Sequence, residues 1–213
     1  MDRIRINKVH YPVTALGFGS RIGIWVQGCS LHCSGCLSRD TWDADGGQGW
    51  DIAALLEAVA ALLPLGCDGI TISGGEPFEQ PEALKVLLPA LRELIGPDRD
   101  LLCYSGYPYS LLRKRHSNLL EYLDALIPEP YRKTWSPGKL WRGSSNQPLV
   151  ALTALGGARY ENTAHDPTSR CIQVAVDQSA VWLIGIPQTG DLMRLENILA
   201  DKGIRFGAVS WRA

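Results

Sequence analysis

Apolar runs and amphipathic segments alternate along the first 130 residues, and their spacing predicts an order of strands and helices. Short apolar runs rich in β-forming residues mark four expected strands, at 21–29, 68–77, 100–107 and 124–130. Apolar positions at helical spacing mark the expected helices, at 51–65, 80–96 and, in two pieces, 109–115 and 118–123. Strands that alternate with helices in this way indicate a parallel sheet built from βαβ units.

The pattern becomes less regular from 131 to 169, where Ser, Pro, Gly, Arg and Trp predict loops around a short strand at 148–155. The C-terminal pattern is clearer and predicts a β-hairpin, a helix and a final strand, at 171–187, 189–203 and 204–211. We therefore expect a single domain over 1–213, with a core at about 20–155 and an extension at about 170–213.

Length, composition and charge narrow the class of protein. The chain has 213 residues, 46% of them apolar, and a net charge of −1, so bulk electrostatics does not favour binding to nucleic acid or an anionic membrane. No apolar run reaches the roughly 20 residues of a membrane span, and the N-terminus has no apolar signal-peptide core. The expected location is the cytoplasm, where clustered cysteines indicate metal ligands or catalytic groups rather than disulfides.

Three of the six cysteines, Cys29, Cys33 and Cys36, lie close together at the spacing C-x3-C-x2-C. This spacing favours an iron–sulfur or a zinc site, because both take thiolate ligands. Three thiolates leave one position open, either on a four-coordinate zinc ion or on the fourth iron of a 4Fe–4S cluster. His32, inside the same loop, is either a fourth ligand or a solvent-facing loop residue.

The other three cysteines, Cys67, Cys103 and Cys171, are expected to pack in the interior, since free cysteine is among the most buried residue types. The cysteine loop, the stretch SGGEP (73–77) and the stretch YSGY (104–107) each end or follow an expected strand. Because the carboxyl ends of parallel strands meet at one edge of a sheet, we expect these three stretches to share one site.

C-x3-C-x2-C after the first strand of a βα protein resembles the signature of the radical S-adenosylmethionine (SAM) enzymes. The resemblance implies an α/β fold, a partial (β/α)6 radical SAM barrel, here followed by a C-terminal β-hairpin–helix–strand extension. It also implies that Cys29, Cys33 and Cys36 each bind one iron of a 4Fe–4S cluster, whose fourth iron binds the methionine part of SAM. Reductive cleavage of SAM then gives a 5′-deoxyadenosyl radical for hydrogen abstraction. Because cleavage itself requires no general acid or base, no catalytic residue is assigned.

SGGEP resembles the GGE motif of the same superfamily, which hydrogen-bonds the ammonium group of SAM. Gly74 and Gly75 allow close approach of the backbone to a ligand, and Glu76 offers a charge-assisted acceptor for an ammonium. In activase-like members a stretch similar to YSGY flanks bound SAM, so Ser105 is a further expected contact. A turn at the start of a helix explains YSGY almost as well.

Residues 26–47, VQGCSLHCSGCLSRDTWDADGG, resemble the first loop of glycyl-radical-enzyme activases of the pyruvate formate-lyase and anaerobic ribonucleotide reductase types. Residues 140–147, LWRGSSNQ, resemble a late segment of the reductase activases, and they either line the SAM or substrate side of the barrel or form a capped surface loop. Many radical SAM enzymes have an aromatic residue where this chain has Gly35; the reductase activases resemble this chain there. IPEPY (127–131) replaces the Asp-Gly-Pro that reductase activases tend to have.

The resemblance implies a radical SAM oxidoreductase that activates a glycyl radical enzyme, with a flavodoxin- or ferredoxin-like electron donor. The alternative is a stand-alone radical SAM enzyme that modifies a small metabolite or a peptide precursor. A C-terminal third that covers the barrel mouth would favour this alternative, whereas an exposed mouth with an apolar rim would favour the activase. A third hypothesis, a structural zinc or electron-transfer iron–sulfur module, leaves SGGEP unexplained.

Overall fold

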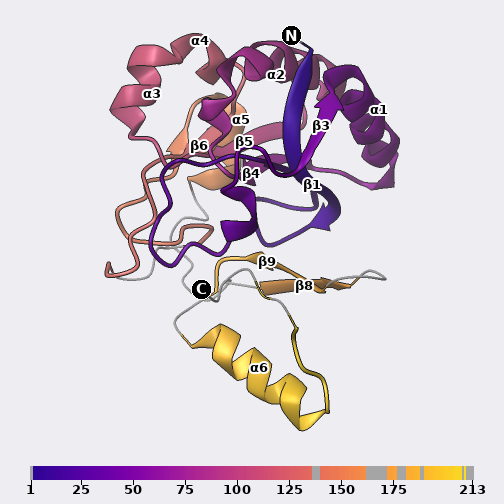
Figure 1. The fold of residues 1–213 in the computed structure, drawn as a ribbon. Helices are drawn as coiled ribbons and strands as arrows, with labels where there is room; N and C mark the ends of the chain where they lie inside the picture. The colour runs from indigo at the N-terminus through magenta and orange to yellow at the C-terminus, as the bar shows by residue number, and fades with distance from the viewer. Residues whose placement is uncertain are drawn as a thin grey trace.

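The computed structural model describes residues 2–135, 140–161, 172–176, 181–187, 190–207 and 209 of the chain. Their largest element is a seven-stranded sheet with the strand order β3-β1-β2-β4-β5-β6-β7 (Figure 1). Its strands are β1 (Arg3–Val13), β2 (Arg21–Val26), β3 (Gln48–Asp51), β4 (Gly69–Gly74), β5 (Asp100–Tyr104), β6 (Ala125–Ile127) and β7 (Val150–Ala151). Among the described helices, none is long and apolar enough to cross a membrane.

Four parallel strands, β2, β4, β5 and β6, form the centre of the sheet and follow one another in chain order. Every residue of β2 is buried, as is typical of a parallel strand covered on both faces. The register pairs Val26 with Gly74, so that β2 and β4 end side by side at one edge of the sheet. The expected parallel arrangement is confirmed for these four strands, whereas the (β/α)6 barrel stays a prediction.

Three antiparallel strands extend the two edges of this parallel centre. β1 pairs with β2 and with β3 on one side, and β7 pairs with β6 on the other. A short strand is expected near β7, but β1 and β3 are not predicted from the sequence. The alternation of β1 shifts at an irregularity between Ile6 and Lys8, so its apolar residues do not keep a strict period of two.

One face of the sheet is covered by helices (Figure 1). They are α1 (Ile52–Leu62), α2 (Pro81–Ile95), α3 (Tyr109–Arg115) and α4 (Ser117–Leu120). The main core lies between these helices and the sheet and includes Leu55, Ile72 and Leu87, all fully buried. Burial of a side chain of this size contributes about 1.5–3 kcal/mol.

At the amino ends of the parallel strands, Arg21 and Asp100 form a fully buried ion pair. Arg21 Nη1 and Nη2 donate to the two oxygens of Asp100 at 2.9 and 2.8 Å. Two residues of α5 (Ala154–Tyr160), a helix that is not predicted from the sequence, bind the same carboxylate: Arg159 and, at 2.6 Å, the Tyr160 hydroxyl. Burial alone would raise the pKa of Asp100, but Arg21 and the α5 side chains hold this pKa below its usual value.

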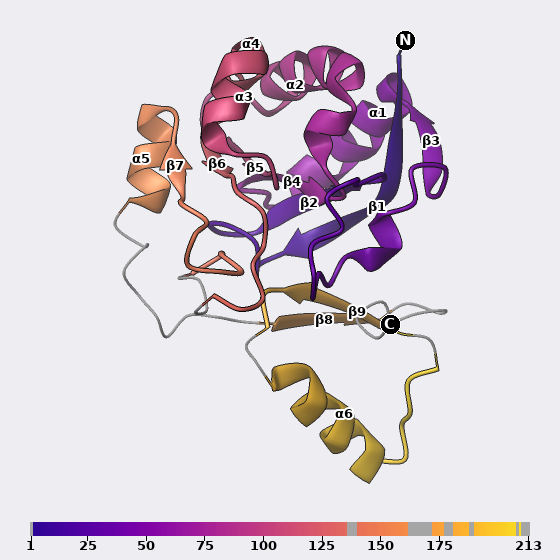
Figure 2. The same ribbon diagram turned by 60° about the vertical axis from the view of Figure 1, so that its left-hand side comes forward.

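The C-terminal part contains a two-stranded sheet, β8 (Ile172–Val176) and β9 (Val181–Gly185), followed by α6 (Asp191–Asp201). The hairpin lies on the face of the main sheet that is turned away from α1–α4 (Figure 2). The expected hairpin and helix are therefore confirmed. Ile204–Gly207 form no strand, and most of the remaining residues of the final strand expected at 204–211 lie outside the described part.

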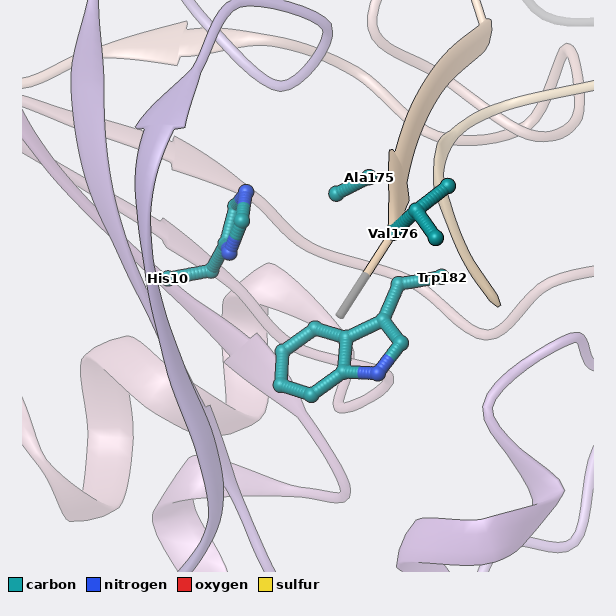
Figure 3. A pocket seen from close by; sticks show the side chains of 4 residues that line it. All are labelled: His10, Ala175, Val176 and Trp182. Carbon is teal, nitrogen blue, oxygen red and sulfur yellow. The ribbon is translucent and has the colours of Figure 1, made fainter. Parts of the chain in front are cut away.

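The hairpin packs directly on the main sheet. Ile184 of β9 is 3% exposed and lies among Val13, Leu16 and Trp25. The side-chain amide oxygen Oε1 of Gln173 accepts a hydrogen bond from Thr14 N at 2.9 Å. Between β1 and the hairpin remains a pocket of about 50 Å³, with room for one or two waters (Figure 3). It is lined by His10, Ala175, Val176 and Trp182.

Candidate functional site

The loops that follow β2 and β4 are joined by their backbones. Gly75 N donates to Val26 O at 2.9 Å, and Glu76 N donates to Gly28 O at 2.8 Å. A Cβ on Gly75 would lie 2.1 Å from Gly28 O, and one on Gly74 would lie 2.6 Å from the backbone of Val26. The glycine pair is therefore required for the contact between the two loops, before any ligand is considered.

The cysteine loop is closed on itself by hydrogen bonds between its two ends. Gly28 N and Cys29 N donate to Thr41 O and Trp42 O at 2.7 and 3.1 Å. The buried Gln27 amide donates to two carbonyl oxygens of the returning segment, those of Asp40 and Asp43, at 3.1 and 2.7 Å. Gln27 is not among the residues that the sequence analysis singles out, because an amide between an apolar strand and a cysteine motif carries no signal of its own.

His32 lies at the exposed tip of the cysteine loop. Its backbone has a positive φ of 44°, a conformation that few residues other than glycine adopt. Its ring stacks on Trp42, with the ring centroids 4.5 Å apart, and the Arg39 guanidinium lies 5.0 Å from the Trp42 ring centroid. The structure thus agrees with the interpretation of His32 as a solvent-facing loop residue.

Gly35, the departure from the aromatic residue of many radical SAM enzymes, has a structural reason. Its φ is +79°, and a Cβ here would lie 2.9 Å from the Lys133 side chain. The neighbouring Tyr131 lies close enough to Cys36 for this thiol, after burial, to raise the pKa of Tyr131. The Lys133 side chain, from the segment after β6, therefore lies against Gly35, and the positive φ of Gly35 disfavours a larger residue there.

Glu76 is the most enclosed charged group of this edge, with 1% of its surface exposed. Its Oε1 accepts from Phe78 N at 3.0 Å and from the Ser105 hydroxyl at 2.8 Å, and its Oε2 accepts from Gly106 N at 2.7 Å. These donors favour the carboxylate, but burial outweighs them and raises the pKa of Glu76 to about 7. Oε2 keeps capacity for one further donor.

Ser105 connects the loop after β5 to the other two. Its hydroxyl donates to Glu76 and accepts from Tyr107 N at 3.0 Å, and its own N–H donates to Ile127 O at 3.0 Å. The structure thus brings Gly74, Gly75, Glu76 and Ser105 together beside Gly28, the residue before Cys29. The common edge that the sequence predicts for the three stretches is present.

The segment 140–147 forms a loop whose side chains hydrogen-bond to the backbone of residues 129–132. Asn146 Nδ2 donates to Pro130 O at 2.8 Å, Gln147 Nε2 donates to Glu129 O at 2.9 Å, and the Ser144 hydroxyl accepts from Arg132 N at 3.1 Å. These side chains bind the backbone of 129–132, which leads to the residues that pack on Gly35. These contacts cap the loop, but Leu140, Trp141 and Ser144 are buried, so it is not a surface loop, and its place on the SAM or substrate side stays a prediction.

The described cysteines form a buried group and a loop group, as the sequence predicts. Cys67 and Cys103 are 5% and 2% exposed, and burial raises the pKa of both thiols. Cys171 lies outside the described residues. Cys29, Cys33 and Cys36 are half-buried thiols without a disulfide partner, and Cys36 N donates to Cys33 O at 3.0 Å.

The three loop thiols suit a cluster with several irons. Burial raises the pKa of Cys29 to about 11, so that the thiol is protonated without metal and metal binding would release a proton. Within the described ranges, no three His, Cys, Asp or Glu side chains are gathered closely enough to hold a single metal ion. Thiolates that each bind a different iron of a cubane need not meet at one point.

Residues 15–150, more than half of the chain, match the family model described as "4Fe-4S single cluster domain". The chain therefore belongs to this family of iron–sulfur proteins. Among its relatives is the anaerobic ribonucleoside-triphosphate reductase-activating protein of enterobacteria phage T4, 32% identical over 64% of this chain and 87% of the relative. The protein of the same description from Haemophilus influenzae is 31% identical over 65% of this chain and 92% of its own length. The one from Escherichia coli K12 is 29% identical over 65% and 93%.

Proposed function

We propose that this protein is a radical SAM enzyme that activates a glycyl radical enzyme. The observation that carries the proposal is the junction of three loops at one sheet edge, where Glu76 binds the backbone of the cysteine loop through its N–H and the loop after β5 through its carboxylate. The relatives, which are reductase-activating proteins by name, support the activase within the radical SAM class.

In this proposal each role falls to a residue of this edge. Cys29, Cys33 and Cys36 would hold the 4Fe–4S cluster, and Glu76 Oε2 would accept a hydrogen bond from the ammonium group of SAM. When bound, the cluster would supply the one electron that cleavage of SAM to methionine and a 5′-deoxyadenosyl radical requires, and this radical would abstract hydrogen from the substrate. A flavodoxin- or ferredoxin-like protein would deliver the electron.

The test is anaerobic reconstitution with iron and sulfide, followed by addition of SAM and dithionite and an assay for 5′-deoxyadenosine. We expect the product from the wild type and none from Cys33→Ala, which should also lose the cluster absorbance. Glu76→Ala should keep the cluster and bind SAM more weakly. Product formation that survives in Cys33→Ala, or a normal SAM affinity in Glu76→Ala, would remove that residue from its proposed role.

A specific observation favours a second candidate, a stand-alone radical SAM enzyme for a small molecule or peptide. The C-terminal hairpin covers the sheet face opposite the helices, and Ile184 is buried against Trp25 there (Figure 2). A folded partner that approached from this face would meet the hairpin first. The loaded enzyme should therefore be mixed with an anaerobic ribonucleoside-triphosphate reductase and followed by electron paramagnetic resonance. A carbon radical on the reductase would decide for the activase, and 5′-deoxyadenosine without such a radical would decide for the second candidate.

A further inference from the structure

The carboxylate of Glu79 binds the residue that directly follows the first cysteine of the loop. Glu79 ends the short 3-10 turn Pro77–Glu79, three residues after Glu76. Its Oε1 accepts from Ser30 N at 2.9 Å and from the Ser30 hydroxyl at 2.5 Å, and its Oε2 lies 3.2 Å from the same N–H. Both polar hydrogens of Ser30 are therefore held by one side chain from another loop.

This contact is the last of three successive ties between the two loops. Gly75 N binds Val26 O, Glu76 N binds Gly28 O, and Glu79 binds Ser30, so the ties continue the pairing of β2 with β4 beyond the ends of the strands. The first two ties are backbone hydrogen bonds and survive most substitutions. The third depends on a side chain and lies next to Cys29, whereas a further side-chain hydrogen bond, from Gln80 Nε2 to Gln27 O at 3.0 Å, joins the loops at their base.

A third loop reaches the same carboxylate. The Tyr107 hydroxyl, from the stretch after β5, donates to Glu79 Oε1 at 3.4 Å. After burial, the negative charge of Glu79 is the largest contribution that raises the pKa of Tyr107. The carboxylate thus fixes the start of the cysteine loop between two neighbouring loops, and it brings a negative charge within one residue of Cys29.

We propose that Glu79 is a positioning residue for the iron–sulfur cluster, which holds Cys29 in place through Ser30 and keeps the reduction potential of the cluster low. Net charge and hydrogen bonding around the thiolates set the potential of such clusters, and a nearby negative charge opposes the addition of an electron. A low potential is the property that reductive cleavage of SAM demands. The inference rests on the proposed ligation of iron by Cys29.

The first experiment measures the tie itself, without metal. Amide hydrogen exchange of Ser30 is followed by nuclear magnetic resonance in the apo chain, in the wild type, Glu79→Ala and Glu79→Gln. We expect Ser30 N–H to exchange about ten-fold faster or more in Glu79→Ala, the effect of losing one hydrogen bond to a charged group. Glu79→Gln retains one acceptor oxygen, so the exchange rate of its Ser30 N–H should lie between those of the wild type and Glu79→Ala.

The second experiment measures the cluster in the reconstituted full chain. Glu79→Gln removes the charge and keeps the shape, so its potential should be less negative than that of the wild type. Ser30→Ala keeps the charge and removes one donor, so it should keep the wild-type potential and lose iron to a chelator faster. The matched control is Glu82→Gln, on the surface of α2, whose carboxylate side chain is 74% exposed and paired with Lys85. In Glu82→Gln, both the reduction potential and the rate of iron loss to the chelator should stay at their wild-type values.

Each possible outcome either supports or contradicts the proposed role of Glu79. Unchanged Ser30 exchange in Glu79→Ala would show that the tie is absent in solution. Faster exchange with wild-type iron retention and potential would show that the tie does not serve the cluster. An equal potential shift in Glu82→Gln would assign the effect to overall charge. If Glu79→Ala does not fold, Glu79→Gln and Ser30→Ala still give the answer. A chain that shows all expected shifts but cleaves no SAM would defeat the proposed function and leave this inference standing.

Discussion

Replacement of Gly75 by alanine tests whether the glycine pair joins two loops of the protein. The added Cβ would lie 2.1 Å from Gly28 O, 2.8 Å from Gly28 C and 3.1 Å from Gly28 N. To reach a separation of even 3.0 Å from the oxygen, the backbone of one loop would have to move by roughly 0.9 Å. No flexible side-chain end is available to absorb this movement, because the contact is with backbone atoms.

The loss in free energy of unfolding on Gly75→Ala can be worked out from the contacts that such a movement would break. Two hydrogen bonds join the loops here, from Gly75 N to Val26 O and from Glu76 N to Gly28 O, and each is worth about 1 kcal/mol net. Overpacking in a tight site adds about 1–3 kcal/mol. We expect Gly75→Ala to lower the free energy of unfolding of the apo chain by ~3–5 kcal/mol in total. In a chain of this size each 1 kcal/mol lowers Tm by about 2–4 °C.

The assay is urea unfolding followed by tryptophan fluorescence, with Gly157→Ala as the matched control. Gly157 lies inside α5, and its nearest neighbour to an added Cβ is the Glu161 side chain at 3.4 Å. Alanine is favoured over glycine in a helix, so this control should stabilise the chain by about 0.5–1 kcal/mol. A Gly75→Ala chain within 1 kcal/mol of the wild type would refute the reasoning and leave ligand approach as the reason for the glycine.

Three further predictions address the rest of the fold by the same unfolding assay. Asp100→Asn leaves the buried Arg21 without its counter-charge and should destabilise the chain by ~3–5 kcal/mol; a loss below 1 kcal/mol would mean that the pair is solvated. Ile184→Ala should cost ~2–5 kcal/mol if the hairpin is held to the sheet, and almost nothing if the hairpin detaches in solution. Because burial raises the pKa of Glu76 to about 7, the folded chain keeps a proton that the unfolded chain loses above its usual pKa of 4.5. The free energy of unfolding should therefore fall by roughly 3 kcal/mol from pH 4.5 to 7 through this group, and Glu76→Gln should lack that part of the slope.

The centre of the fold could be predicted because its sequence pattern is local. The runs that become β2, β4, β5 and β6 are short, apolar and separated by amphipathic helices, so their parallel direction follows from the chain itself. The meeting of the three loops follows in turn, because parallel strands end at one edge. The ties between the loops do not follow, since nothing near Ser30 in the sequence points to Glu79.

Other elements escape prediction because their stability comes from distant contacts. β1 has an irregularity between Ile6 and Lys8 that breaks the alternation by which a strand is recognised. α5 contains a glycine pair, which disfavours a helix, yet Gly156 is required because a Cβ there would lie 1.9 Å from Asp124 O. The helix is then held by the Thr153 cap and by the bonds of Arg159 and Tyr160 to Asp100.

Most of the C-terminal third lies outside residues 15–150, the part of the chain that matches the family model. The three relatives compared align over 87–93% of their own lengths but over only 64–65% of this chain. Residues 15–150 contain the cysteine loop, the glycine pair and Glu79, so the machinery proposed for radical formation lies within the family match. The hairpin lies beyond the matched residues and packs through Ile184 on the sheet face opposite the helices. We therefore expect the hairpin to affect substrate access, and Ile184→Ala tests this because it weakens the contact of the hairpin with the sheet.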